Sequence, residues 1–89
     1  MVHMGIITTM AEEQKIKQDG IILIGQNIRR IRLAKGMGQT KLAGQVQLLG
    51  VDITRELLVK IERGAQHLYA SQLRAIRDVL DTSYDELLK

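Results

Sequence analysis

The sequence predicts an all-α domain of five short helices around one aliphatic core. After residue 20, apolar residues recur at spacings of three and four, which is the period of an amphipathic helix. No run alternates apolar and polar residues over the length of a strand, and proline is absent from the 89 residues. A glycine, which commonly ends a helix, follows each of the first three apolar patterns: Gly36, Gly50 and Gly64. A chain of this length suits one small domain.

The first two predicted helices cover residues 24–35 and 39–49. The apolar face of the first consists of Ile24, Ile28 and Ile31. The apolar face of the second consists of Leu42, Ala43, Val46 and Leu49. Gly44 lies inside the second helix, where it lowers the helical propensity.

Three further helices complete the prediction. The third covers about residues 54–63, with Thr54 or Asp52 as its N-cap. The fourth carries the apolar residues Leu73, Ile76 and Leu80. The fifth begins at Ser83, because Ser83 and Glu86 match the S-x-x-E capping box.

The amino-terminal segment, residues 1–20, shows no sustained period. We expect it to be a mobile tail outside the folded domain, which covers residues 21–89. Met1 to Met4 resemble a cloning remnant.

The composition excludes several classes of function. Without cysteine there is no disulfide framework, Cys-ligated zinc site or thiol nucleophile, and two tyrosines form no stacking platform for single-stranded nucleic acid. The longest aliphatic run, Ile21–Ile24, is too short to span a membrane, and no secretory signal is evident. His3 and His67 lack metal-ligand spacing, and no phosphate-binding glycine loop occurs. We therefore expect a cytoplasmic protein that is not an enzyme and has no cofactor and no metal site.

Positive charge is concentrated in the centre of the chain. Residues 28–63 contain eight basic and three acidic residues, whereas the segments before and after them each carry a net charge of −1. Such a stretch is either a solvated helical surface or the electrostatic footprint of a polyanion.

The predicted third helix has two different faces. One half of its helical wheel carries Leu57, Leu58, Ile61 and Glu62. The other half carries Arg55, Glu56, Val59, Lys60 and Arg63. The second half suits a DNA major groove, where Arg and Lys donate to guanine, Glu accepts from cytosine and an aliphatic group contacts a thymine methyl. An ordinary amphipathic surface helix is the alternative interpretation.

Glu62 is unusual because it falls on the buried half of that wheel. A buried carboxylate requires a partner. Arg32 lies at the edge of the apolar face of the first helix. We therefore predict a structural ion pair between Arg32 and Glu62 that joins the first helix to the third.

Four blocks in the region 24–88 carry a resemblance to a known family. They are I-G-Q-N-I-R-R-I-R at 24–32, G-x-x-Q-x-x-L-A at 36–43, K-I-E-R-G at 60–64 and L-x-x-I-x-x-V-L-D-T-S-x-D-E-L-L at 73–88. In these blocks the chain resembles the lambda-repressor-like helix-turn-helix family of bacteria and phages, of the Cro/repressor or xenobiotic-response-element type. In that family the second helix crosses the phosphate backbone and the third enters the major groove.

The resemblance implies roles for particular residues. The base-contacting candidates are Arg55, Glu56, Val59 and Lys60. The phosphate-contacting candidates are Gln39, Thr40, Lys41, Thr54 and Arg63. Arg32 and Glu62 match the inter-helix ion pair of the family, in agreement with the helical-wheel argument.

The chain departs from the family pattern in two respects. Eighteen residues separate Ala43 from Glu62, about five more than is usual. The extra segment, residues 47–50, is expected to lengthen the second helix and the turn after it, which indicates a subgroup. In addition, Gly38 replaces the usual Ser or Asn cap of the second helix, and Asp81 replaces the glycine that usually ends the fourth.

The resemblance implies a sequence-specific regulator of transcription, a repressor that binds double-stranded DNA as a homodimer on an inverted repeat. Leu87 and Leu88 of the fifth helix are the expected dimer surface. The alternatives are an antitoxin-type regulator, a protein-interaction module that lacks DNA binding, and, least favoured, an enzyme fragment. Glu56 fits the interaction module somewhat better, because a carboxylate repels phosphates.

Overall fold

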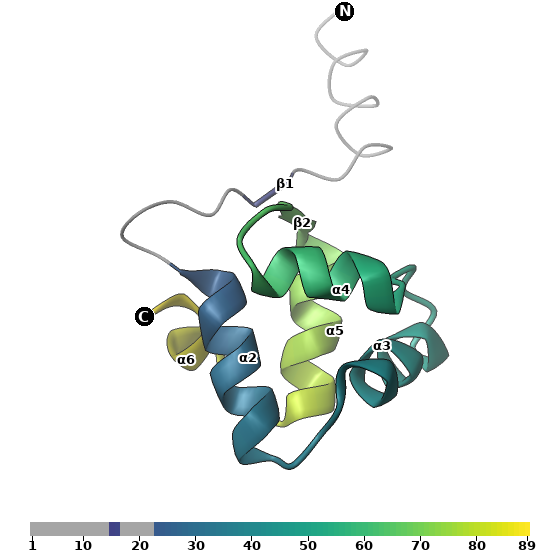
Figure 1. The fold of residues 1–89 in the computed structure, drawn as a ribbon, viewed down its shortest axis with the longest axis horizontal. Coiled ribbons are helices and arrows are strands. Elements are labelled where there is room, and N and C mark those ends of the chain that lie inside the picture. Colours follow the sequence, from purple (N-terminus) through teal and green to yellow (C-terminus); the bar gives the residue numbers. More distant parts are fainter. Residues whose placement is uncertain (1–14, 17–22) are drawn as a thin grey trace, which may run out of the picture.

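The computed structural model describes residues 15–16 and 23–89. Within this part the chain forms five helices and two short strands (Figure 1). Their bounds are β1 (Lys15–Ile16), α2 (Ile24–Ala34), α3 (Gln39–Leu48), α4 (Arg55–Glu62), β2 (Leu68–Tyr69), α5 (Ala70–Leu80) and α6 (Tyr84–Leu88). All five predicted helices are present, which confirms the all-α class.

The core lies between the helices and is aliphatic. Helix α5 packs against α3 and α2, α4 packs against α2 and α3, and α6 packs against α2 (Figure 1). Nearly all side chains predicted to face inward are buried: Ile24, Ile28, Ile31, Leu42, Ala43, Val46, Leu73, Ile76 and Leu80. There are two exceptions. Leu57, on the inward half of α4, is only half-buried. Leu49 lies just beyond the end of α3 and has 55% of its surface exposed. The predicted apolar face of that helix therefore ends at Val46.

Two residues of the predicted tail belong to the fold. Lys15 and Ile16 form β1, which pairs antiparallel with β2, so that Lys15 is opposite Tyr69 and Ile16 is opposite Leu68. Ile16 also packs against the core. The sequence does not predict this pairing, because a two-residue strand is too short to show an alternating pattern. The rest of the predicted tail lies outside the described residues.

Thr54 caps helix α4. Its Oγ1 accepts a hydrogen bond from the backbone N–H of Leu57 at 3.0 Å, which decides between the two predicted caps, Thr54 and Asp52. Helix α3, by contrast, begins after Gly38 and has no side-chain cap. The first N–H groups of α3 therefore remain available for another acceptor.

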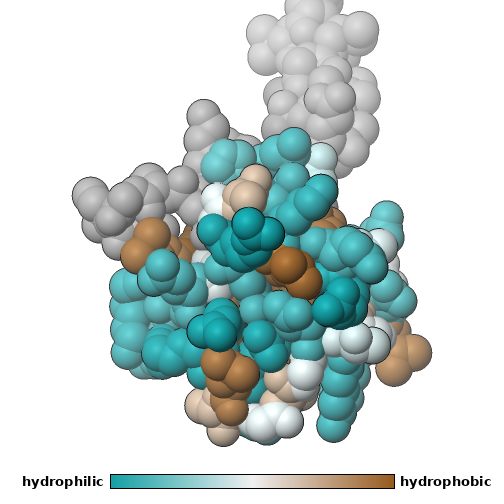
Figure 2. Space-filling view, viewed as in Figure 1, coloured by the Kyte–Doolittle hydropathy of each residue, from teal (hydrophilic) through white to brown (hydrophobic). Residues whose placement is uncertain are grey.

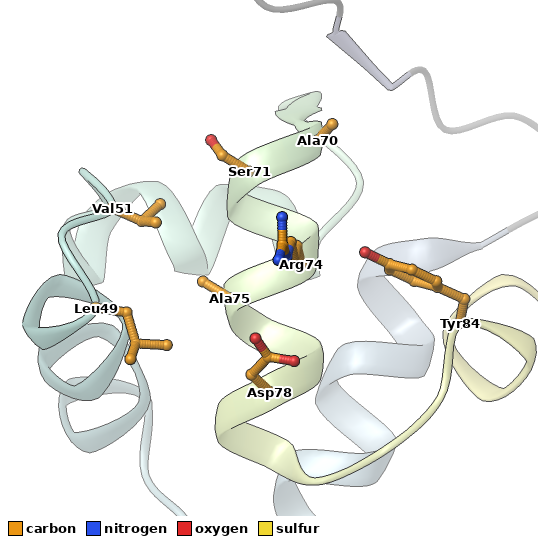
Figure 3. A pocket seen from close by; sticks show the side chains of 8 residues that line it. All are labelled: Leu49, Val51, Ala70, Ser71, Arg74, Ala75, Asp78 and Tyr84. Carbon is orange, nitrogen blue, oxygen red and sulfur yellow. The ribbon is translucent and has the colours of Figure 1, made fainter.

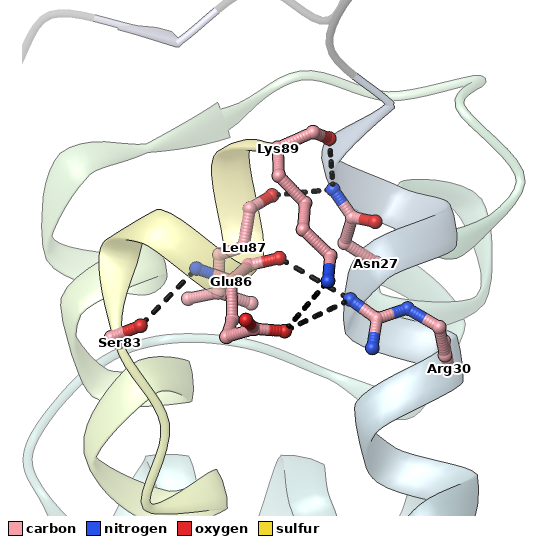
Figure 4. A network of polar contacts seen from close by, with 6 residues as sticks. All are labelled: Asn27, Arg30, Ser83, Glu86, Leu87 and Lys89. Carbon is pink, nitrogen blue, oxygen red and sulfur yellow. Dashed lines mark hydrogen bonds and ion pairs between the residues drawn. The ribbon is translucent and has the colours of Figure 1, made fainter.

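Polar contacts fix helix α6 against α2 (Figure 4). Asn27 Nδ2 donates to the carbonyl oxygens of Leu87 and Lys89 at 2.9 and 3.0 Å. Ser83 Oγ accepts from the Glu86 N–H at 3.2 Å, which is one half of the predicted capping box. In place of the other half, the Glu86 carboxylate pairs with Lys89 Nζ at 3.1 Å, and this contact lowers the pKa of Glu86.

The position of α6 corrects the predicted dimer surface. Leu87 is completely buried in the core, so it is not available to a second chain. Leu88 is the only leucine of the pair that reaches the surface. The main role of α6 is therefore to close the core.

Asp81 offers a simple test of the backbone at the end of α5. It has φ +52° and ψ +53°, the left-handed conformation in which glycine is favoured. We expect Asp81→Gly to raise the free energy of unfolding by about 0.5–1 kcal/mol, because it removes the strain of a side chain in this conformation. Thermal unfolding measures this change. Asp52→Gly, where the backbone has a negative φ, should lower stability; a loss of stability at both positions would contradict the explanation.

Candidate nucleic-acid interface

A buried ion pair joins α2 to the end of α4. Arg32 Nε donates to Glu62 Oε2 at 2.7 Å, and Arg32 Nη2 donates to Glu62 Oε1 at 2.9 Å. The third nitrogen, Nη1, donates to the Met37 carbonyl at 2.8 Å. Arg32 and Glu62 are only 6% and 4% exposed. The hydrogen bond to Glu62 raises the pKa of Arg32 above its ordinary value, so the guanidinium remains charged.

Gln39 extends this pair to the first turn of α3. Its Nε2 donates to Glu62 Oε1 at 3.1 Å. The start of α3 and the end of α4 are thereby held through one carboxylate. This arrangement fixes the angle between α3 and α4. The angle in turn determines whether the outward faces of both helices can contact one partner at the same time.

Gly25 brings α2 and α4 unusually close together. A Cβ atom at this position would lie 2.0 Å from the Ile61 carbonyl oxygen and 3.0 Å from backbone atoms of Glu62. Only glycine therefore permits this approach. Sequence reasoning missed the role of Gly25, because a glycine inside a helical pattern does not reveal which backbone lies against it.

The turn between α3 and α4 is held from two sides. Gln47 donates to the Ile53 carbonyl, and the buried Gln72 donates to the Asp52 carbonyl at 3.0 Å. Gln72 Oε1 also accepts from the Tyr69 N–H at 2.7 Å. The turn between α3 and α4 is therefore ordered, and α4 begins at a defined place. Gln72 was not predicted as a positioning residue, because a glutamine at a buried helical position has no distinctive sequence pattern.

The outward face of α4 carries the residues predicted to contact bases. Arg55, Glu56 and Lys60 are exposed, whereas Val59 is half-buried. Arg63, which ends the helix, is also exposed. Figure 2, in the same view as Figure 1, shows a mainly hydrophilic surface over α4. The face therefore combines three cations, one carboxylate and a small apolar contact.

The predicted phosphate-contacting residues lie at the starts of α3 and α4. Thr40 and Lys41 are exposed in the first turn of α3, and Thr54 is exposed at the cap of α4. Gln39 is half-buried, because its amide is directed at Glu62. The structure thus places Gln39 partly in the interior, where it positions the ion pair as well as reaching the surface.

The cations of this surface have no acidic partner among the described residues. Within the part of the chain that the structure describes, no ion pair or hydrogen bond is recorded for the side chains of Lys41, Arg55, Lys60 or Arg63. A groove of about 480 Å³ between α2 and the end of α4 adds Arg29 next to Arg63. The surface formed by α4 and its neighbours is therefore able to attract an anionic partner.

The chain is similar to a solved structure of another protein. It is the high-resolution crystal structure of the restriction-modification controller protein C.AhdI from Aeromonas hydrophila, with a TM-score of 0.64 and 29% sequence identity. The match covers 76% of this chain and 96% of that chain. The fold is a repressor-like helix-turn-helix fold. In this helix-turn-helix fold, α3 and α4 form the two-helix unit. No family model matches the chain, and the search of curated proteins found no match.

The described residues contain neither a metal-binding cluster nor a membrane-spanning helix. Among them, no group of three His, Cys, Asp or Glu side chains is placed to hold a metal ion. No helix in this part of the chain is long and apolar enough to cross a membrane.

Proposed function

We propose that this protein is a sequence-specific regulator of transcription, a repressor that binds a palindromic double-stranded DNA operator as a homodimer. The observation that carries the proposal is the cationic surface of α4, whose cations have no ion-pair partner among the described residues. This helix is joined at Glu62 to Arg32 of α2 and to Gln39 of α3. The similarity to C.AhdI, a restriction-modification controller protein, supports a regulatory role.

In the proposed complex, α4 enters the major groove and α3 lies across the phosphate backbone. Arg55 and Lys60 donate to base edges, Glu56 accepts from cytosine, and Val59 contacts a thymine methyl. Lys41, Thr54 and Arg63 contact phosphates, as do the uncapped N–H groups at the start of α3. Phosphate contacts supply most of the affinity, and α4 supplies the choice of sequence. Occupation of a promoter then represses transcription.

The first test is binding to random duplex DNA at two salt concentrations, measured by fluorescence anisotropy. If the cations contact several phosphates, the logarithm of the affinity should fall steeply with the logarithm of the salt concentration. No measurable binding at low salt would contradict the proposal. That result would favour a protein-interaction module, for which Glu56 on the outward face is the supporting feature.

A pair of variants separates base contacts from phosphate contacts. We expect Arg55→Ala to cost about 1–3 kcal/mol on the selected operator and to relax the preference at one base pair. Lys41→Ala should weaken binding to all duplexes alike and lower the salt slope by about 1. Selection of bound duplexes from a random pool measures the first effect, and titration at several salt concentrations measures the second. An equal, sequence-independent loss from both variants would refute the assigned roles.

A further inference from the structure

A shallow groove of about 540 Å³ runs along the outer side of α5. Figure 3 shows Leu49 and Val51 on one side of α5 and Tyr84 on the other. Between these apolar flanks, α5 itself presents the small residues Ala70 and Ser71 and the charged residues Arg74 and Asp78. Small side chains along a helix allow another helix to approach closely.

The apolar flank next to α3 is strongly exposed. Leu49, which lines the groove, is 55% exposed. Leu48, the last residue of α3, does not line the groove but precedes Leu49 in the chain and is 85% exposed. Both belong to residues 47–50, the segment that lengthens this region. Neither leucine belongs to the buried core cluster. Adjacent exposed leucines are typical of a surface that another protein covers.

The two charges of the groove have opposite signs and lie one helical turn apart on the same face of α5. Arg74 is exposed, and within the described residues no ion pair or hydrogen bond is recorded for its side chain. Asp78 accepts from Arg77 through Oδ1, at 2.7 and 3.0 Å, so Oδ2 remains able to accept from another donor. Arg77 also lies over the Tyr84 ring, 4.5 Å from its centre. Asp78 is therefore held in position, while Arg74 has no partner among the residues that the structure describes.

We propose that this groove binds the same groove of a second copy of the chain, with the two α5 helices antiparallel and Arg74 of each copy paired with Asp78 of the other. The proposal specifies the homodimer required by the proposed function and rests on it to that extent. Residues predicted to contact DNA do not line the groove, so a second copy seated there leaves them accessible.

The charges and the apolar flanks select this arrangement. A two-fold axis that lies between the two α5 helices and perpendicular to them, level with the turn between Arg74 and Asp78, brings each cation against the carboxylate of the other copy. The same axis keeps the Leu49 flank of one copy against the Leu49 flank of the other. A parallel arrangement would instead place Arg74 against Arg74, and such a like-charge contact is unfavourable.

Charge reversal tests the pairing directly. Arg74→Asp places two carboxylates in each contact of the homodimer, and Asp78→Arg places two cations there. We expect each variant alone to weaken dimerisation at least about tenfold relative to the wild type, measured by sedimentation equilibrium without DNA. An equimolar mixture of the two variants should restore the dimer, because every contact in the mixed pair again joins opposite charges.

A matched pair of leucine variants tests the apolar flank. Leu49→Glu should weaken the dimer at least about tenfold, because it places a charge in the contact. Leu33→Glu is the control, because Leu33 is 52% exposed and does not line the groove. Thermal unfolding confirms that each variant is folded. A monomeric wild type, an undiminished dimer in the single charge variants, or a mixture that stays monomeric would each overturn the proposal.

The outcome is independent of the test of DNA binding. If the wild type binds random duplex DNA with a steep salt dependence but the charge variants dimerise normally, this inference fails and the proposed function stands. If the mixture restores the dimer but no DNA binding is found, the proposed function fails and the dimer surface stands.

Discussion

Glu62→Ala should lower the free energy of unfolding by about 3–5 kcal/mol, because it leaves the buried Arg32 guanidinium without its carboxylate. The loss is a large fraction of the total, since domains of this kind have unfolding free energies of about 5–15 kcal/mol. Each kcal/mol of lost unfolding free energy lowers the melting temperature by about 4–8 °C in a domain of this size. Denaturant titration together with thermal unfolding measures the effect.

Glu56→Ala is the matched control, because Glu56 is an exposed glutamate on the same helix. Its removal should change stability by less than about 0.5 kcal/mol. A Glu62→Ala protein that unfolds together with the wild type would show that the pair contributes nothing to the fold. Glu62 also accepts a hydrogen bond from Gln39. In the fraction of Glu62→Ala protein that remains folded, the angle between α3 and α4 should therefore be less fixed. Its binding to every duplex should be weaker.

The helices could be predicted because each carries a regular apolar face and a chemical signal at an end. Ile28, Leu58 and Ile76 are completely buried at the positions that the helical period indicates. Thr54 and Ser83 cap the helices that they were predicted to start. Such signals are local, so a single sequence contains them.

Arg32 and Glu62 show that a long-range contact can also be predicted when it involves a buried charge. A carboxylate on the inner half of a helical wheel requires a partner, and few cations lie near an apolar face. The bidentate geometry between them follows from the structure alone. The outward position of Arg55 and Lys60 could likewise be predicted from the helical wheel, whereas their roles on DNA remain proposals.

Other features could not be predicted, because they depend on which elements meet in space. The pairing of Ile16 with Leu68 joins segments far apart in sequence and is only two residues long. Leu87 and Leu88 are identical residues and adjacent in the sequence, yet Leu87 is buried and Leu88 is exposed. Gln72 donates to the Asp52 carbonyl only because α5 lies next to the turn that precedes α4. In each case the deciding neighbour is absent from the local sequence.

Gly25→Ala should be the second strongly destabilising substitution. Its new Cβ would lie 2.0 Å from the Ile61 carbonyl oxygen, which belongs to the backbone and cannot rotate away. Helices α2 and α4 must therefore separate, and the movement also disturbs the ion pair at Glu62. We expect a loss of about 1–3 kcal/mol or more, the usual range for overpacking, measured by denaturant titration.

Gly44→Ala is the matched control, because Gly44 is an exposed glycine inside α3 with no atom within 4 Å of the added Cβ. Alanine has a higher helical propensity than glycine, so this substitution should raise the free energy of unfolding by about 0.5–1 kcal/mol. The two changes are chemically identical and both lie within helices, yet they should have opposite signs. If Gly25→Ala were also stabilising, the close approach of α2 to α4 would not constrain the fold. If both substitutions lowered stability, the prediction for Gly44 would be wrong and the one for Gly25 would stand, since nothing near Gly44 obstructs a methyl group.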